Sequence, residues 1–380
     1  MSRQPLLLFL IVCLWFGTSA VRAQPADEKP DKAPVKSEIR PGGREVDMSD
    51  IPPDSSAEES EMKELGPNFK LFRTQHFSVL HNVTDAQVKA FTAAIEKTYR
   101  SNLNYTMTLD IVPKKPKKKL LIYYFSQHED YNNYSQKLGK GPRPQTQPGV
   151  YFPDLNRSMF YDFRNQDTFK KAREDADKKV EDLKKQLSGK VSPEKRKEIN
   201  KQISDAKAQA NRSGVVGGGY TETIVQHEVT HHVLWNVGFH NPKSFVANPR
   251  WFAEGTAMMF ETIGTGKSSN IGAVNKQRLD EYRALEKTNH LFDVKQFISN
   301  PAPFNSPDTI GPAYAQSWAL AHYLNRTKRA AIKGFVERIN KRPADYQPKP
   351  EEEIKEFEKA FGQIDEDWVK KWQAWMKNVR

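Results

Sequence analysis

His227, Glu228 and His231 have the spacing H-E-x-x-H, within the segment QHEVTHH at residues 226–232. On an α-helix, side chains four positions apart lie about 40° from each other on one face, one turn along the axis. Two imidazoles placed in this way can bind one metal ion. Glu228 is rotated by about 100° from His227 and would reach a metal-bound water instead. The pattern therefore predicts a zinc site with a carboxylate beside it that can act as a base.

A catalytic zinc ion generally has three protein ligands and an open position. Glu254, in the segment WFAEGTA at residues 251–257, is the predicted third ligand and follows His231 by 23 residues. Gly255 removes a side chain where we expect two helices to approach closely. For Glu261 two interpretations remain open: a carboxylate that holds a ligand imidazole by its second nitrogen, or a surface residue.

The metal ligands require a helix around the first motif. Gly217–Gly219 break the chain and Thr221 can cap a helix that begins just before the motif. Apolar residues at spacings of one and four predict that this helix has a buried side: Ile224, Val225, Val229, Val233 and Leu234. The turn signals at residues 236–238 predict its end.

The segments HEVTH and WFAEG together resemble the gluzincin branch of the zinc metallopeptidases, in the peptidase MA-like superfamily. The resemblance implies that His227, His231 and Glu254 bind Zn2+, one ion per chain, and that Glu228 is the general base. The exopeptidase signature G-x-M-E-N is missing, so an endopeptidase or oligopeptidase is expected rather than an aminopeptidase.

A third segment, GPAYAQSWAL at residues 311–320, is similar to the tyrosine-led helix that follows the third ligand in aminopeptidase-like members. The resemblance would make Tyr314 the residue that stabilises the oxyanion; the alternative is a core aromatic residue. Residues 67–380 also resemble an uncharacterised exported bacterial family of this superfamily, although the charged insertion at about 167–211 departs from it. The implied fold is zincin-like, of the thermolysin or gluzincin type.

The first part of the chain has the layout of an export signal. Arg3 precedes an apolar run, and small residues follow up to Ala23, so residues 1–23 are interpreted as a signal peptide of a secreted or periplasmic protein. The run is too short to span a membrane, and no transmembrane helix is expected in the mature chain. Residues 24–66 are rich in Pro, Ser and charge, which predicts a disordered linker.

The remaining pattern predicts an α+β catalytic domain over residues 67–380. Strands at 76–80 and 120–125, with helices after each, indicate a small N-terminal α/β lobe ahead of the metal-binding helix. Residues 149–152 and 158–162 indicate a hairpin, and one of its strands is the predicted edge beside which a substrate strand would add. Helical patterns from residue 277 onward predict a mainly α C-terminal lobe.

Two basic or charged features remain. Residues 167–211 indicate a helical hairpin in which Ser192-Pro193 begins the second helix; it is either a substrate lid or partner-binding arm, or an inert insertion. The whole chain has a net charge of +12, and the run Lys114–Lys119 is either a solvated loop or a docking site for an anionic surface polymer. No nucleic acid partner is expected.

Two function classes follow. The first is an exported zinc metallopeptidase acting on a peptide or protein substrate, with Glu228 taking the proton of the water and Tyr314 donating to the oxyanion. The alternative is a non-catalytic exported zinc-containing binding protein, attached to a surface partner through its basic face and helical hairpin. Serine and cysteine hydrolases are disfavoured, because the chain has no G-x-S-x-G segment and its single cysteine lies in the signal.

Overall fold

The structure is a computed structural model that describes residues 47–188, 191–261 and 272–380, which belong to one compact unit, Ser37–Arg380. For residues 168, 172, 173 and 208–221 it describes the backbone alone. The predicted signal peptide and residues 24–46 of the predicted linker lie outside the described residues.

A five-stranded mixed sheet forms the N-terminal lobe, in the order β1-β2-β3-β5-β4. Its strands are β1 Lys70–Arg73, β2 Phe77–His81, β3 Leu120–Phe125, β4 Gly149–Phe152 and β5 Arg157–Tyr161. The three central strands β2, β3 and β5 are parallel, and β1 and β4 pair antiparallel at the two edges. Of the two strands predicted at residues 149–162, β4 is therefore the edge strand.

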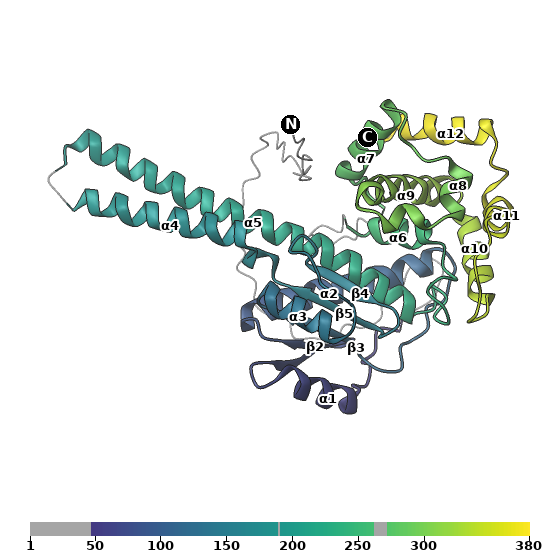
Figure 1. The fold of residues 1–380 in the computed structure, drawn as a ribbon, viewed down its shortest axis with the longest axis horizontal. Helices are drawn as coiled ribbons and strands as arrows, with labels where there is room; N and C mark the ends of the chain where they lie inside the picture. Colours follow the sequence, from purple (N-terminus) through teal and green to yellow (C-terminus); the bar gives the residue numbers. More distant parts are fainter. Residues whose placement is uncertain (1–46, 189–190, 262–271) are drawn as a thin grey trace, which may run out of the picture. The chain divides into compact units, whose positions relative to one another are not determined.

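Helices cover both faces of this sheet (Figure 1). Alternate residues of β3 belong to two apolar clusters: Ile122 packs in the cluster that includes α2 (Asp85–Thr108), whereas Tyr123 packs in the cluster that includes Tyr131 of α3 (His128–Lys137). The central strands are buried on both sides, as parallel strands usually are. α2 follows the first predicted strand, as expected, and the Thr84 hydroxyl caps it by accepting a hydrogen bond from Gln87 N.

A single helix, α5, runs from Pro193 to Asn236 and contains the first motif. The prediction that the helix begins at Thr221 is therefore wrong, because the backbone stays helical through Gly217–Gly219. The end at residues 236–238 is confirmed: Gly238 has a φ of 81°, a left-handed conformation that favours glycine.

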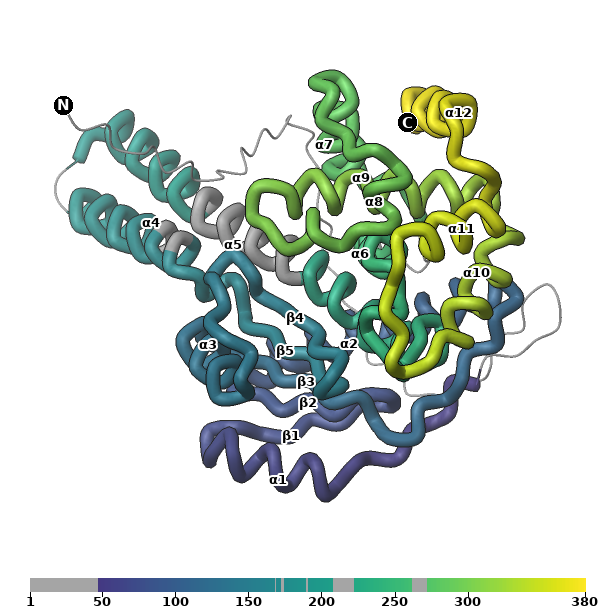
Figure 2. The backbone as a smooth tube through the Cα atoms, turned by 45° about the vertical axis from the view of Figure 1, so that its right-hand side comes forward, coloured from purple at the N-terminus to yellow at the C-terminus, as the bar shows by residue number. Residues whose placement is uncertain are grey.

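The predicted helical hairpin is confirmed, and its second arm is the N-terminal part of α5. Figure 2 shows α4 (Asp167–Leu187) beside this part of α5. Ser192 caps α5 with its hydroxyl, and Pro193 is the first helical residue, as predicted. The seam between the arms buries small and aliphatic side chains: Ala176, Val180, Leu183, Ile199 and Ala206.

The C-terminal lobe is helical, as predicted. Its helices are α6 Arg250–Met258, α7 Lys276–Lys287, α8 Val294–Ser299, α9 Pro307–Thr327, α10 Arg329–Lys341, α11 Pro350–Phe361 and α12 Glu366–Lys377. α9 begins earlier than its apolar pattern indicated: Ser306 caps it, and Pro312 lies inside the helix. Together with the sheet, these helices make a mixed α/β protein, in agreement with the predicted α+β class.

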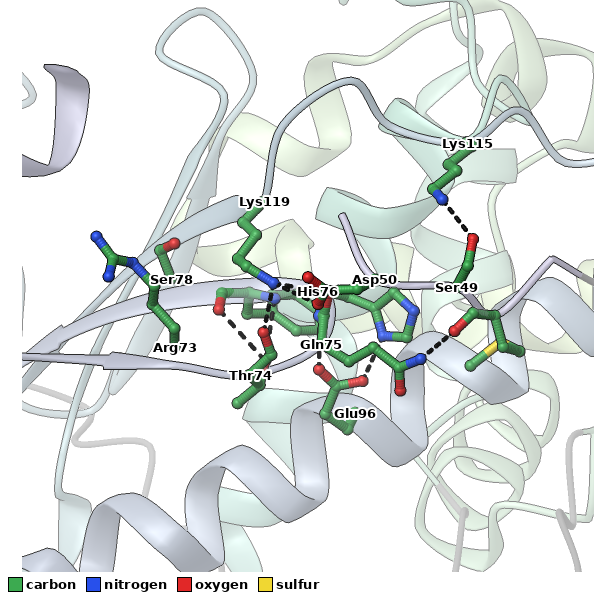
Figure 3. A network of polar contacts seen from close by, with 12 residues as sticks. Ser49, Asp50, Arg73, Thr74, Gln75, His76, Ser78, Glu96, Lys115 and Lys119 are labelled. Atoms are coloured by element: carbon green, nitrogen blue, oxygen red, sulfur yellow. Dashed lines mark hydrogen bonds and ion pairs between the residues drawn. The ribbon is translucent and has the colours of Figure 1, made fainter. Parts of the chain in front are cut away.

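The prediction of disorder is wrong for the last part of the segment 24–66. Ile51 is completely buried, and helix α1 (Ser55–Leu65) follows it. Figure 3 shows this region, where Lys119 Nζ lies 2.7 Å from Asp50 Oδ1. The buried carboxylate of Glu58 accepts hydrogen bonds from Ser78 and from Arg73, whose Nε lies 3.2 Å away.

No helix in the described part of the chain combines the length and the apolar character needed to cross a membrane.

Candidate metal centre and active site

The three predicted ligands meet at one point. His227 and His231 lie one turn apart on α5, and Glu254 comes from α6. His231 Nε2 lies 3.1 Å from His227 Nε2. Glu254 Oε2 lies 3.2 Å from His227 Nε2 and 3.3 Å from His231 Nε2. The side chains of His227 and Glu254 are buried.

This triangle fits a metal ion. For ligand bonds of about 2.0–2.1 Å in tetrahedral geometry, neighbouring ligand atoms lie about 3.3 Å apart. Hydrogen bonding alone explains the cluster less well. One proton cannot bridge all three contacts, namely the contact between the two ring nitrogens and the contact of each nitrogen with the carboxylate. The described residues therefore form a group that could hold a metal ion.

Glu261 holds the His227 ring from its other side. His227 Nδ1 lies 3.0 Å from Glu261 Oε1. α6 ends at Met258, so the turn after the helix, rather than the helix face, brings Glu261 to the ring. Of its two interpretations, the one in which it contacts a ligand imidazole agrees with the structure. Burial opposes ionisation of Glu261, but Arg278 and His227 outweigh it and lower its pKa.

Glu228 lies between the metal-ligand cluster and the edge of the sheet. Its Oε2 accepts a hydrogen bond of 2.9 Å from the main-chain N–H of Tyr151 on β4. Tyr161 N donates a hydrogen bond to Pro148 O, so these two residues form a hydrogen-bonded pair of the two strands. Hydrogen-bonded and non-hydrogen-bonded pairs alternate along an antiparallel ladder, and the pair of Tyr151 with Ser158 is of the second kind. The N–H and C=O of Tyr151 therefore point away from β5. The outer edge of β4 therefore faces the carboxylate that was predicted to be the base.

A third histidine of the motif fastens β4 to α5. His232 Nδ1 lies 3.0 Å from Ser158 Oγ, and its ring stacks on Tyr151 with centroids 4.8 Å apart. Burial lowers the pKa of His232 to about 3, so the ring is neutral at physiological pH. The H-E-x-x-H motif gives His232 no role, although its place directly after His231 turns it to another side of the helix, toward the sheet.

Close contact between α6 and α9 positions Glu254. A Cβ atom added to Gly255 would lie 2.5 Å from Ser317 O and 2.8 Å from Ala321 Cβ. A close approach of two helices at Gly255 is confirmed, but the helix that packs against α6 there is α9 and not, as expected, the metal-binding helix α5.

Tyr314, on α9, lies in the same cavity as the metal-ligand cluster. Its ring centroid is 6.3 Å from that of His227, and the Arg278 guanidinium lies 5.7 Å from the ring centroid on its face. The carboxylate of Glu254 and then burial raise the pKa of Tyr314, which keeps the phenol protonated. Tyr314 is partly exposed, unlike a residue whose whole side chain belongs to the core.

The cavity at this centre has a volume of about 140 Å³. Besides the predicted site residues, it is lined by Tyr151 and Val150 of β4 and by two residues that our reading of the sequence missed, His240 and Arg250. Arg250 Nε lies 3.3 Å from Glu254 Oε1, the carboxylate oxygen that faces away from the histidines. The spacing of four between Arg250 and Glu254 on one helix is the signal that could have revealed this pair.

The loop between α5 and α6 is fixed by two buried asparagines. Asn248 Oδ1 accepts a hydrogen bond of 2.7 Å from Asn241 N, and Asn241 Nδ2 donates to the carbonyls of Ile339 and Arg342. These contacts tie the loop to the end of α10 and thus hold α6 in place relative to α5.

The basic run Lys114–Lys119 lines a different cavity, of about 460 Å³. Several of its lysines contact the segment 47–53: Lys115 bonds Ser49, Lys118 Nζ lies 3.3 Å from Pro53 O, and Lys119 pairs with Asp50. The run thus makes intramolecular contacts; its two interpretations, a solvated loop or a docking site for an anionic polymer, both stay predictions.

Residues 221–345 match the model of a family described as a protein of unknown function (DUF1570). The comparisons with curated proteins and with solved structures each found no match. The matched span contains the three predicted ligands, Glu228 and Tyr314, whereas the sheet, with β4, lies before it.

Proposed function

We propose that this chain is an exported zinc-dependent metallopeptidase of the gluzincin type with a zincin-like fold, which cleaves internal bonds of peptides. The observation that carries the proposal is the triangle of His227 Nε2, His231 Nε2 and Glu254 Oε2, with sides of 3.1–3.3 Å, beside the Glu228 carboxylate. Two histidines and one glutamate are a ligand set of catalytic zinc sites. A zinc ion held there would supply a Lewis acid that activates a water and polarises the scissile carbonyl.

Glu228 and the edge of β4 supply the groups that act on the peptide. Glu228 takes a proton from the attacking water and delivers it to the leaving amine, as a general base and then a general acid. The hydrogen bond from Tyr151 N keeps this carboxylate oriented. The C=O of Tyr151 lies on the same strand edge and can bind the main chain of a substrate strand.

Tyr314 is the third group that acts on the peptide, beside Glu228 and the edge of β4. Because its raised pKa keeps the hydroxyl protonated, it can donate a hydrogen bond to the oxygen of the substrate carbonyl as negative charge develops there. Glu261 orients His227 and, through its charge, makes the ring a better ligand.

The test is the variant Glu228→Gln, assayed with a peptide pool by mass spectrometry and for zinc by elemental analysis. Gln keeps the shape of the side chain but cannot accept the proton. We expect one zinc per chain to remain and cleavage to fall by about 10²-fold or more. Cleavage equal to that of the unchanged protein would refute the base assignment. Stoichiometric zinc without chelator-sensitive cleavage of any peptide by the unchanged protein would favour a binding protein instead.

A further inference from the structure

A second cavity opens beside the metal centre. It has a volume of about 200 Å³ and shares Phe245, Asn248 and Arg250 with the cavity that contains the three ligands. Its remaining lining is largely apolar and includes Val246, Phe297, Ile298 and Phe304. Phe245 and Val246 are exposed by 46% and 47%, which is unusual among the large apolar residues of the described chain. The apolar surface of the second cavity is therefore continuous with the reaction centre.

Arg250 lies where the two cavities join. Its guanidinium carbon is 5.4 Å from the ring centroid of Phe304 and 5.9 Å from that of Phe245, so two aromatic side chains pack against the group. Its Nε faces Glu254 Oε1 at 3.3 Å. Among the described residues, no acceptor bonds either Nη atom, and the side chain is 28% exposed.

The geometry leaves the outer edge of a fixed guanidinium available to a ligand. Two parallel N–H donors of an arginine match the two oxygens of a carboxylate, and this pairing is stronger than hydrogen bonds between neutral groups. The two rings limit the motion of the side chain, which reduces the entropy lost on binding.

We propose that Arg250 binds a carboxylate of the substrate and that the second cavity binds an apolar side chain next to that carboxylate. The inference rests on the proposed peptidase function and assigns its substrate class: peptides with an apolar residue and a carboxylate beside the scissile bond. A cavity of about 200 Å³ is smaller than typical ligand pockets of about 300–1,000 Å³, so one side chain fits but a longer segment does not.

A binding measurement tests the proposal independently of turnover. The zinc-loaded protein is titrated by calorimetry with N-acetylphenylalanine, which combines a ring and a carboxylate, and with its uncharged amide. We expect the acid to bind at least about tenfold more tightly than the amide, and Arg250→Gln to abolish this preference. Arg196→Gln, the same change at an exposed arginine of the hairpin, should leave it unaltered. Zinc content is measured in every sample.

The alternative is that Arg250 acts only by holding Glu254. In that case Arg250→Gln would weaken the binding of the acid and of the amide equally. Alternatively, the variant would lose zinc and would regain its normal preference for the acid when zinc is added in excess. Either result overturns the proposal. Arg250→Lys keeps the charge but not the paired donors, and we expect it to recover only part of the preference.

Matched peptides then distinguish the two sources of the carboxylate. One pair ends in phenylalanine as the free acid or the amide, and the other pair is amidated and carries an internal glutamate or glutamine beside phenylalanine. Arg250→Gln should reduce kcat/KM by about tenfold or more for the charged member of one pair and by much less for its neutral partner. Equal reductions in both pairs overturn the assignment.

The second cavity is tested by placing a negative charge at its exposed rim. Val246→Glu should weaken the binding of N-acetylphenylalanine by about tenfold or more, because the new carboxylate repels that of the ligand and makes the cavity polar. Val112→Glu is the matched control, since Val112 is 64% exposed and lines neither cavity. Equal effects of both variants overturn the role of the cavity. If no peptide is cleaved but the acid still binds selectively through Arg250, the binding site stands and the peptidase proposal fails.

Discussion

His227 is held from both sides of its ring: Nδ1 lies 3.0 Å from Glu261 Oε1, while Nε2 points to His231 and Glu254. The other oxygen of Glu261 accepts a hydrogen bond of 2.9 Å from Asn275 Nδ2. This chain of contacts keeps the proton of a neutral His227 on Nδ1 and presents the lone pair of Nε2 to an ion.

We therefore predict that Glu261→Gln lowers zinc affinity by about tenfold to a hundredfold, because the ring loses the charge that makes it more basic. Competition with a fluorescent chelator measures the affinity. Glu337→Gln, at an exposed position on α10, is the control and should bind zinc normally. Unchanged affinity in Glu261→Gln would show that the contact has no influence on the ion.

The pH dependence of zinc binding follows from the same ring. In the metal-free chain, burial disfavours the charged form of His227, but Glu254 and Glu261 outweigh this effect and raise its pKa to about 10. Zinc must displace that proton. We expect zinc affinity to rise about tenfold per pH unit between about pH 7 and 9, with release of about one proton on binding. Calorimetry in buffers of different ionisation enthalpy measures the proton.

The stability of the metal-free chain depends on pH in the opposite direction to zinc affinity: it falls as the pH rises. Because the pKa of His227 is higher in the folded state than its ordinary value of 6.5, its proton stabilises the fold fully below about pH 6.5. This contribution is lost as the pH rises through about 10. Denaturant titrations with a chelator present should show the decline, and a variant His227→Gln should not.

Tyr314→Phe should reduce kcat by about a hundredfold while zinc content stays at one per chain, because only the donor to the developing oxyanion is removed. Steady-state kinetics with one defined peptide measures the effect. Tyr282→Phe is the control: its hydroxyl is buried without a hydrogen-bond partner among the described residues, and Tyr282 does not line the metal-site cavity. An undiminished kcat in Tyr314→Phe would leave this residue with a packing role alone.

Gly255→Ala should destabilise the protein by about 1–3 kcal/mol, because the new methyl group would collide with the backbone of α9 at Ser317. Gly311→Ala is a matched control on α9, since a Cβ there meets nothing within 4 Å. It should be neutral or slightly stabilising. Denaturant unfolding measures both variants, and a Gly255→Ala protein as stable as the Gly311→Ala protein would contradict the close packing.

Ile51→Ala should cost about 2–4 kcal/mol of the free energy of unfolding, because Ile51 is fully buried in the main apolar cluster. Val112→Ala, at an exposed residue, should cost less than about 0.5 kcal/mol. Equal stabilities of the two variants would mean that the segment before α1 does not belong to the folded core.

The sequence predicted well those features that depend on local pattern. The short, continuous apolar run at residues 120–125 indicates a strand buried on both faces. The spacing of apolar residues in α2 identifies a helix, because a helix places residues three and four positions apart on one face. The group of His227, His231 and Glu254, which could hold a metal ion, was predictable because metal chemistry restricts both residue type and spacing.

The features that were missed depend on contacts between distant residues. Gly217–Gly219 disfavour a helix locally by about 1 kcal/mol per residue relative to alanine, yet α5 continues through them. The composition of the segment 24–66 hides Ile51 and Glu58, whose partners in β1 and β2 become visible only in the fold. Tyr151 lies at the centre because of sheet geometry that no motif encodes.

The wide sequence spacing of the cavity walls has a consequence for the order of folding. Val150 and Tyr151 precede His227 by more than seventy residues, and Tyr314 follows Glu254 by sixty. Closing such long loops is slow compared with forming a helix. A nascent chain can present the paired imidazoles of one helical turn early, but the enclosed pocket arises only when both lobes have docked. A metal ion bound at this site would therefore exchange slowly with an external chelator only after the last stage of folding.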